Sequence, residues 1–149
     1  MSLRWACVPV LALALATAGC GGSDVMSAHQ LRTGAARVCT VTAQRLNRIP
    51  TPQIPSEGAV FLRRGIAAVA PELAALSAMH PDGELGVHFR QAVSATEQEL
   101  KVLQSSLRGL KAGNDPIVAI KTLQVQLAPL EAKSRAAWAA LGVPGCADT

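Results

Sequence analysis

Residues 84–111, ELGVHFRQAVSATEQELKVLQSSLRGLK, carry the pattern that decides the fold of this chain. Apolar or β-branched side chains recur along this stretch at steps of three and four residues, at Leu85, Phe89, Val93, Thr96, Leu100, Leu103, Leu107 and Leu110. Such steps place side chains on one stripe of an α-helix and are typical of a bundle or coiled-coil seam. Gly113 and Asn114 then supply a C-terminal stop. The stretch therefore predicts one long amphipathic helix.

Three further segments show helical periodicity. The first is expected over residues 27–48. The second begins at Ser56, a good N-cap, and ends before the turn at residues 80–83. The third begins at Asp115 and ends at Gly142. Their apolar stripes are Leu31, Ala35, Val38, Thr42, Leu46 and Ile49; then Leu62, Ile66, Val69, Leu73 and Leu76; and finally Ile120, Leu123, Leu127, Leu130 and Leu141, with Trp138 beside them.

Composition and connection length favour an all-α fold. Half of the 149 residues are hydrophobic and only 16% are charged, which excludes intrinsic disorder. No useful run alternates as a strand does. Four amphipathic helices with short connections pack most simply as an antiparallel up-down four-helix bundle, here residues 28–149. Pro71 and Pro129 lie within the second and fourth helices and predict a kink in each. Phe61, Phe89 and Trp138 are expected in the core.

Residues 1–19 have the organisation of an export signal. Arg4 gives a basic start, an apolar run follows over residues 8–16, and the small residues Thr17, Ala18 and Gly19 come next. The apolar run is shorter than the roughly 20 residues that cross a bilayer as a helix. We therefore expect this segment to be removed on export.

The sequence Ala18-Gly19-Cys20, followed by Gly21-Gly22-Ser23-Asp24, resembles a bacterial lipoprotein signal. The resemblance implies that Cys20 is acylated and becomes the mature N-terminus, that residues 20–27 form a lipidated tether, and that the protein is anchored on the extracytoplasmic face of the cell membrane. Stable anchoring takes two or more acyl chains. The alternative is cleavage before Gly19, after the small residues Ala16 and Ala18, which yields a soluble secreted protein.

The four cysteines are consistent with the lipid anchor. Cys7 leaves with the signal and lipidation uses Cys20, so Cys39 and Cys146 remain as an even pair in an oxidising compartment. In the up-down topology the end of the last helix lies beside the first. Cys39 is about three turns, or roughly 16 Å, into that helix, and residues 142–146 reach it at about 3.3 Å per residue. We predict a Cys39–Cys146 disulfide.

Candidate chemistry elsewhere is sparse. His80 and His88 lie near Met79, Asp82 and Glu84, a grouping that suits a divalent metal or copper, although a solvated turn is the alternative. No nucleophile, base and orienting group share a helical face. In-helix paired carboxylates occur only at Glu97 and Glu99, on different sides. We therefore expect no enzyme activity, no metal and no cofactor.

Basic residues gather near the start of the mature chain. Residues 25–56 contain no acid, and Arg37, Arg45 and Arg48 lie opposite or at the edge of the first apolar stripe. This face is either solvated or in contact with anionic lipid, at about 1 kcal/mol per residue. Nucleic acid is not an expected partner, because stacking platforms need aromatic residues.

Residues 51–58 (TPQIPSEG), 62–65 (LRRG) and 137–146 (AWAALGVPGC) are similar to stretches of small helical lipoproteins of high-G+C bacteria. That resemblance implies no particular activity. The expected function is a non-enzymatic, lipid-anchored envelope protein that binds or organises a partner. The alternatives are a small-ligand or metal-binding bundle and a soluble secreted helical protein.

Overall fold

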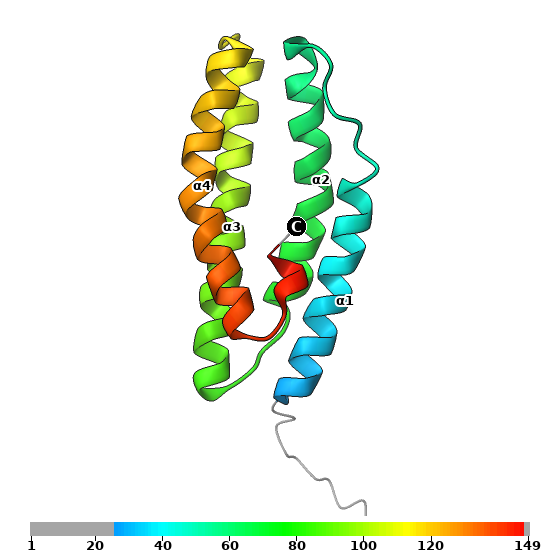
Figure 1. The fold of residues 1–149 in the computed structure, drawn as a ribbon, viewed down its shortest axis with the longest axis vertical. Coiled ribbons are helices and arrows are strands. Elements are labelled where there is room, and N and C mark those ends of the chain that lie inside the picture. The colour runs from blue at the N-terminus through cyan, green and yellow to red at the C-terminus, as the bar shows by residue number, and fades with distance from the viewer. Residues whose placement is uncertain (1–25, 148–149) are drawn as a thin grey trace, which may run out of the picture.

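The structure, a computed structural model, describes residues 26–147. Within that range the protein is all-helical, with four α-helices packed against one another and no strand (Figure 1). The elements in chain order are α1 (Ala28–Leu46), the 3₁₀ turn η1 (Pro55–Glu57), α2 (Gly58–Ser77), α3 (Gly83–Lys111), α4 (Pro116–Ala140) and the 3₁₀ turn η2 (Pro144–Cys146).

Local side-chain chemistry starts two of the helices where the sequence predicts. Ser27 Oγ accepts from the backbone N–H of Gln30 at 3.2 Å, and Gln30 Oε1 accepts from that of Ser27 at 2.8 Å, which completes a capping box for α1. Asp115 accepts from the backbone N–H groups of Ile117 and Val118, both at 2.9 Å. These bonds satisfy amides that the first turn leaves without a helical partner.

The prediction that Ser56 is the N-cap of the second helix is wrong. Ser56 lies inside η1, and α2 begins two residues later at Gly58. The cap position belongs to Glu57, whose side chain does not bond to the helix but accepts from the backbone N–H of Gln53 at 2.8 Å. The reason is Pro55, whose fixed φ favours a tight turn before the helix proper.

Helix packing follows the predicted stripes. α3 packs most extensively against α4, α2 packs against α3, and α1 packs against α2. The buried core residues include Leu31, Ala35, Leu62, Val69, Leu76, Phe89, Leu100, Leu123, Trp138 and Leu141. Phe89 meets Trp138 edge-on, with ring centroids 5.9 Å apart. Phe61 corrects the expectation of three core aromatics: it is 38% exposed, because it lies one residue off the α2 stripe.

The C-terminal tail folds back from the end of α4 toward α1 (Figure 1). Gly142 has φ +72°, a conformation that glycine adopts without strain, and it turns the chain away from α4. η2 then lies against both α1 and α4, as Figure 1 shows for the red segment beside α1. The Arg32 Nε–H of α1 donates to the carbonyl oxygen of Leu141 at 2.8 Å. The first and last helices are therefore joined through the tail.

Candidate functional site

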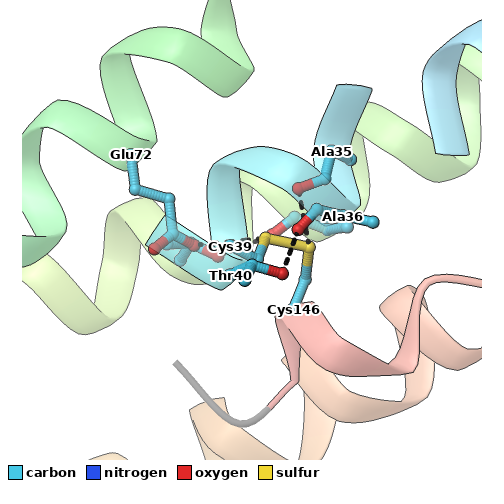
Figure 2. Close-up of a disulfide and its surroundings, with 8 residues drawn as sticks. Ala35, Ala36, Cys39, Thr40, Glu72 and Cys146 are labelled. Carbon is cyan, nitrogen blue, oxygen red and sulfur yellow. Dashed lines mark hydrogen bonds between the residues drawn. A yellow bond between two sulfur atoms is a disulfide. The ribbon is translucent and has the colours of Figure 1, made fainter. Parts of the chain in front are cut away.

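A buried disulfide joins the tail to the first helix. The sulfur atoms of Cys39 and Cys146 lie 1.98 Å apart and their Cα atoms 5.0 Å apart, so the predicted pair is present. Both residues belong to the hydrophobic core. Figure 2 shows Glu72 of α2 on one side of the bond, with Oε1 3.6 Å from Cys39 Sγ. The Ala35 carbonyl oxygen lies 3.6 Å from Cys146 Sγ on the other side.

Three carboxyl groups from three helices converge next to this disulfide. They are Glu72 of α2, only 2% exposed, Glu99 of α3 and Glu131 of α4. Burial, with smaller contributions from the neighbouring charges of Glu131 and Glu72, raises the pKa of Glu99 to about 7, against a hydrogen bond with Ser134 that lowers it. Glu72 and the hydroxyl groups of Thr96 and Ser134 are buried, so the bundle interior contains a polar layer beside these acids.

A cavity with two lobes adjoins this layer. The apolar lobe has a volume of about 370 Å³ and the polar lobe about 290 Å³. Both lobes are lined by Val69, Glu99, Leu103 and Glu131, so they meet at these residues. The apolar lobe also includes Leu46, Ile49, Phe61, Leu62, Gly65 and Leu127. The polar lobe also includes Thr96, Ser134, Arg135, Cys146 and Ala147. The volume of the apolar lobe suits a small organic molecule, since ligand pockets span about 300–1,000 Å³.

The two acids that line both lobes have no basic partner in the described part of the chain. Within residues 26–147, neither Glu99 nor Glu131 lies within ion-pair distance of a basic side chain. Glu99 Oε1 is buried and has no hydrogen-bond partner among these residues. A buried acceptor without a donor costs about 1–3 kcal/mol. The junction of the lobes is therefore suited to a group that donates hydrogen bonds or carries positive charge.

We predict that Glu99→Gln raises the free energy of unfolding by about 1–2 kcal/mol near pH 8 and changes it little near pH 5. The gain at pH 8 is kept to this size because Glu99 is partly exposed to solvent, which screens its charge. The pKa of Glu99 rises on folding from 4.5 to about 7. The folded state therefore holds this proton more tightly, and the wild-type chain loses stability as pH rises through that interval. Urea unfolding at both pH values measures the effect.

Glu97→Gln is the matched control, because Glu97 is exposed and pairs with Lys101 at 2.7 Å on the outer side of α3. This variant is expected to show no gain at the higher pH. An equal gain for Glu99→Gln at both pH values contradicts the buried-carboxyl explanation, since the ionised form is the source of the cost.

The two candidate histidines occupy different surroundings. His80 lines a separate cavity of about 470 Å³ with Met79 and Asp82. His88 does not line that cavity and lies on α3, with Nε2 3.8 Å from Glu84 one turn earlier. Across the described part of the chain, no three His, Cys, Asp or Glu residues form a group that holds a metal ion. The structure therefore does not assemble the metal site considered from sequence.

The predicted basic face is exposed. Arg37, Arg45 and Arg48 all lie on the solvent side of α1 or just after it. None of the three forms an ion pair within the range that the structure covers. Contact between this face and lipid stays a prediction.

The export signal at residues 1–19 and the lipidation site at Cys20 lie outside the described residues. None of the described helices combines the length and apolar character that crossing a membrane requires.

Sequence reasoning missed the carboxyl cluster because it paired acids only within one helix. A signal was nevertheless present in α2. Val69, Glu72 and Leu76 are spaced by three and four residues, so Glu72 occupies the apolar stripe itself. An acid on a core stripe indicates a buried polar site. No spacing within the chain relates Glu72 to Glu99 or Glu131, however.

Comparisons with protein-family models, with curated proteins and with solved structures find no match to this chain. The chemistry of the cavity is therefore the basis for assigning a function. That chemistry is an apolar lobe that meets a buried carboxyl group, and it suits the binding of a small molecule.

Proposed function

We propose that this chain is a non-enzymatic, lipid-anchored protein of the extracytoplasmic envelope that binds a small apolar ligand between the helices of an antiparallel up-down four-helix bundle. The two-lobed cavity is the observation that carries the proposal. Its apolar lobe draws residues from the end of α1, from α2, from α3 and from α4, so a ligand there contacts all four helices.

Short connections support the up-down arrangement. Residues 78–82 join α2 to α3, and residues 112–115 join α3 to α4. Connections of this length join antiparallel neighbours in helical bundles. Each helix also packs against the one that follows it in the chain. The arrangement accounts for the meeting of η2 with α1.

We also propose the kinks at Pro71 and Pro129. Both prolines lie inside continuous helices, where each removes one backbone hydrogen bond. Glu72 follows the first proline directly, and Glu131 lies two residues after the second. Kinks at these points would separate the helices beside the cavity, which is a physical reason for its position.

The buried disulfide supports export. Disulfides persist in oxidising compartments and are rare in the cytosol. Because Cys39 and Cys146 are joined to each other, Cys20 is left for lipidation. If Cys20 is lipidated, only seven residues separate it from the start of α1 at Ala28, so the bundle would lie close to the membrane. The exposed Arg37, Arg45 and Arg48 would then lie near anionic headgroups. Secretion after cleavage before Gly19 is the alternative.

We predict that Cys20→Ser abolishes membrane anchoring. In a bacterial host that processes lipoproteins, the wild-type chain is expected in the membrane fraction, with a diacylglyceryl group on its N-terminal peptide by mass spectrometry. The variant lacks the thiol that accepts the lipid and is expected to lose that modification. Cys7→Ser is the control and is expected to stay anchored. An unmodified wild-type N-terminus at Gly19 contradicts anchoring and establishes secretion.

Ligand binding is tested with a neutral apolar fluorescent probe, N-phenylnaphthylamine, and the processed chain (residues 20–149) carrying Cys20→Ser to keep it free of lipid. Gly65→Phe is expected to weaken probe binding by about tenfold or more, equivalent to about 1.4 kcal/mol. Gly65 lines the apolar lobe and a Cβ atom there meets nothing within 4 Å, so we expect the added ring to occupy part of the lobe.

Gly65→Ala is the matched control. It makes the same change from glycine within the helix but leaves most of the lobe open, so probe affinity is expected to stay within about twofold. A wild-type chain that binds no probe, or a Gly65→Phe variant that binds as well as Gly65→Ala, overturns the proposed function.

A further inference from the structure

We infer that the ligand is a single-chain amphiphile with a positively charged amine head group, its apolar chain in the lobe beyond Leu103 and its amine at Glu99 and Glu131. This inference rests on the proposed function and adds the chemical class of the ligand. The observation behind it is that the cavity is apolar at one end and acidic where its lobes meet.

The apolar end selects the chain. Apart from Glu99 and Glu131 at the junction, every side chain that lines this lobe is uncharged. Leu46 at the end of α1 and Ile49 just after that helix close the lobe on one side, and Leu127 of α4 also lines it. Each methylene transferred from water into such surroundings contributes about 0.8 kcal/mol. A linear alkyl chain therefore suits this lobe better than a polar molecule does.

The acidic junction selects the head group. An ammonium group carries three donors and no acceptor. It matches the buried Glu99 Oε1, which has no donor among the described residues, and the exposed carboxylate of Glu131 at the mouth. Glu72 does not line the cavity, but it lies close enough to Glu99 to raise the pKa of that carboxyl. A cation placed between these groups offsets their mutual repulsion, whereas a carboxylate or phosphate head group adds to it.

One basic residue lines the cavity and could compete with an amine for the acids. Arg135 of α4 lines the polar lobe and is exposed to solvent. It does not line the apolar lobe, and it forms no ion pair with the acids within residues 26–147. The two carboxyl groups that line the junction, Glu99 and Glu131, outnumber the one guanidinium group, which gives the charge complementarity that an amine needs.

Binding should depend on pH in a defined direction. The charged groups that face Glu99 are Glu131 and Arg135 from α4 and Glu72 from α2. Cys39 of α1 and Cys146 of η2 adjoin the polar layer but do not titrate, because they are joined in the disulfide. Because the pKa of Glu99 is raised to about 7, this carboxyl becomes protonated as pH falls below that value. The affinity for an amine is therefore expected to fall between about pH 8 and pH 6.

The test compares three ligands with one chain length: decylamine, decanol and decanoate. Each displaces N-phenylnaphthylamine from the processed chain with Cys20→Ser, below its micelle concentration. At pH 8, decylamine is expected to displace the probe at a concentration about tenfold lower than decanoate, with decanol between them. Glu99→Gln combined with Glu131→Gln is expected to bring decylamine to within about twofold of decanol. Glu97→Gln, outside the cavity, is expected to preserve the preference.

The outcomes separate the two proposals. If the probe binds but decanoate displaces it as well as or better than decylamine, or if decylamine does not displace it, the amine assignment is overturned and the proposed function stands. An amine preference that survives the double substitution also overturns the assignment to Glu99 and Glu131. If the probe itself does not bind, the proposed function fails.

Discussion

Replacing both half-cystines, Cys39→Ala with Cys146→Ala, is expected to lower the free energy of unfolding by about 3–5 kcal/mol. The bond closes a loop between residues 107 positions apart, so its loss returns much conformational freedom to the unfolded chain. The bond also holds η2 against α1, and Val143 just before η2 is a core residue. Urea unfolding of the processed chain, followed by circular dichroism, measures the change.

The double substitution avoids an unpaired thiol in the core, and chemical reduction of the wild-type chain provides an independent comparison. Cys20→Ser is the matched control, since it replaces a cysteine that is not part of this disulfide, and it is expected to leave the midpoint unchanged. A loss below about 1 kcal/mol would mean that packing alone keeps the tail docked, contrary to the role assigned to the bond.

The second large effect is expected at Trp138, where substitution by alanine should cost about 3–5 kcal/mol. Trp138 is fully buried and is among the largest side chains of the core. It packs edge-on against Phe89 and lies in the cluster that includes Leu31 of α1 and Leu76 of α2. Removing the ring leaves a cavity at the point where α4 meets the rest of the bundle. Urea unfolding again gives the magnitude.

Two variants calibrate that result. Trp138 Nε1 has no hydrogen-bond partner among the described residues, so Trp138→Phe loses volume without losing a bond and is expected to cost much less than alanine. Val125→Ala, on the outer face of α4 where the side chain is 76% exposed, is expected to be nearly neutral. A Trp138→Ala variant as stable as Val125→Ala would contradict the assignment of Trp138 to the core.

Much of the helical architecture follows from local sequence patterns. The steps of three and four residues in residues 84–111 predict α3 to within one residue of its observed start at Gly83. Asp115 caps α4 as predicted, because its carboxylate accepts from amides two and three residues along the same chain. Patterns of this kind depend on residues within one or two turns of each other, so they can be read before the tertiary structure is known.

The start of α2 illustrates how local reasoning fails. Ser56 is a favourable N-cap by residue type, but Pro55 draws it into a 3₁₀ turn and moves the start of the helix to Gly58. Phe61 is a second example, since aromatic character alone suggested burial. Its position beside the stripe instead places it at the rim of the apolar lobe.

The amino-acid sequence by itself determined the all-α class, the apolar stripes, most helix ends and the pairing of Cys39 with Cys146. Only the tertiary structure decided that Glu72, Glu99 and Glu131 meet, and that an apolar cavity opens beside them. The physical reason is that periodicity assigns a residue to a face of its own helix, whereas the axial level and rotation of one helix against another depend on packing between distant segments.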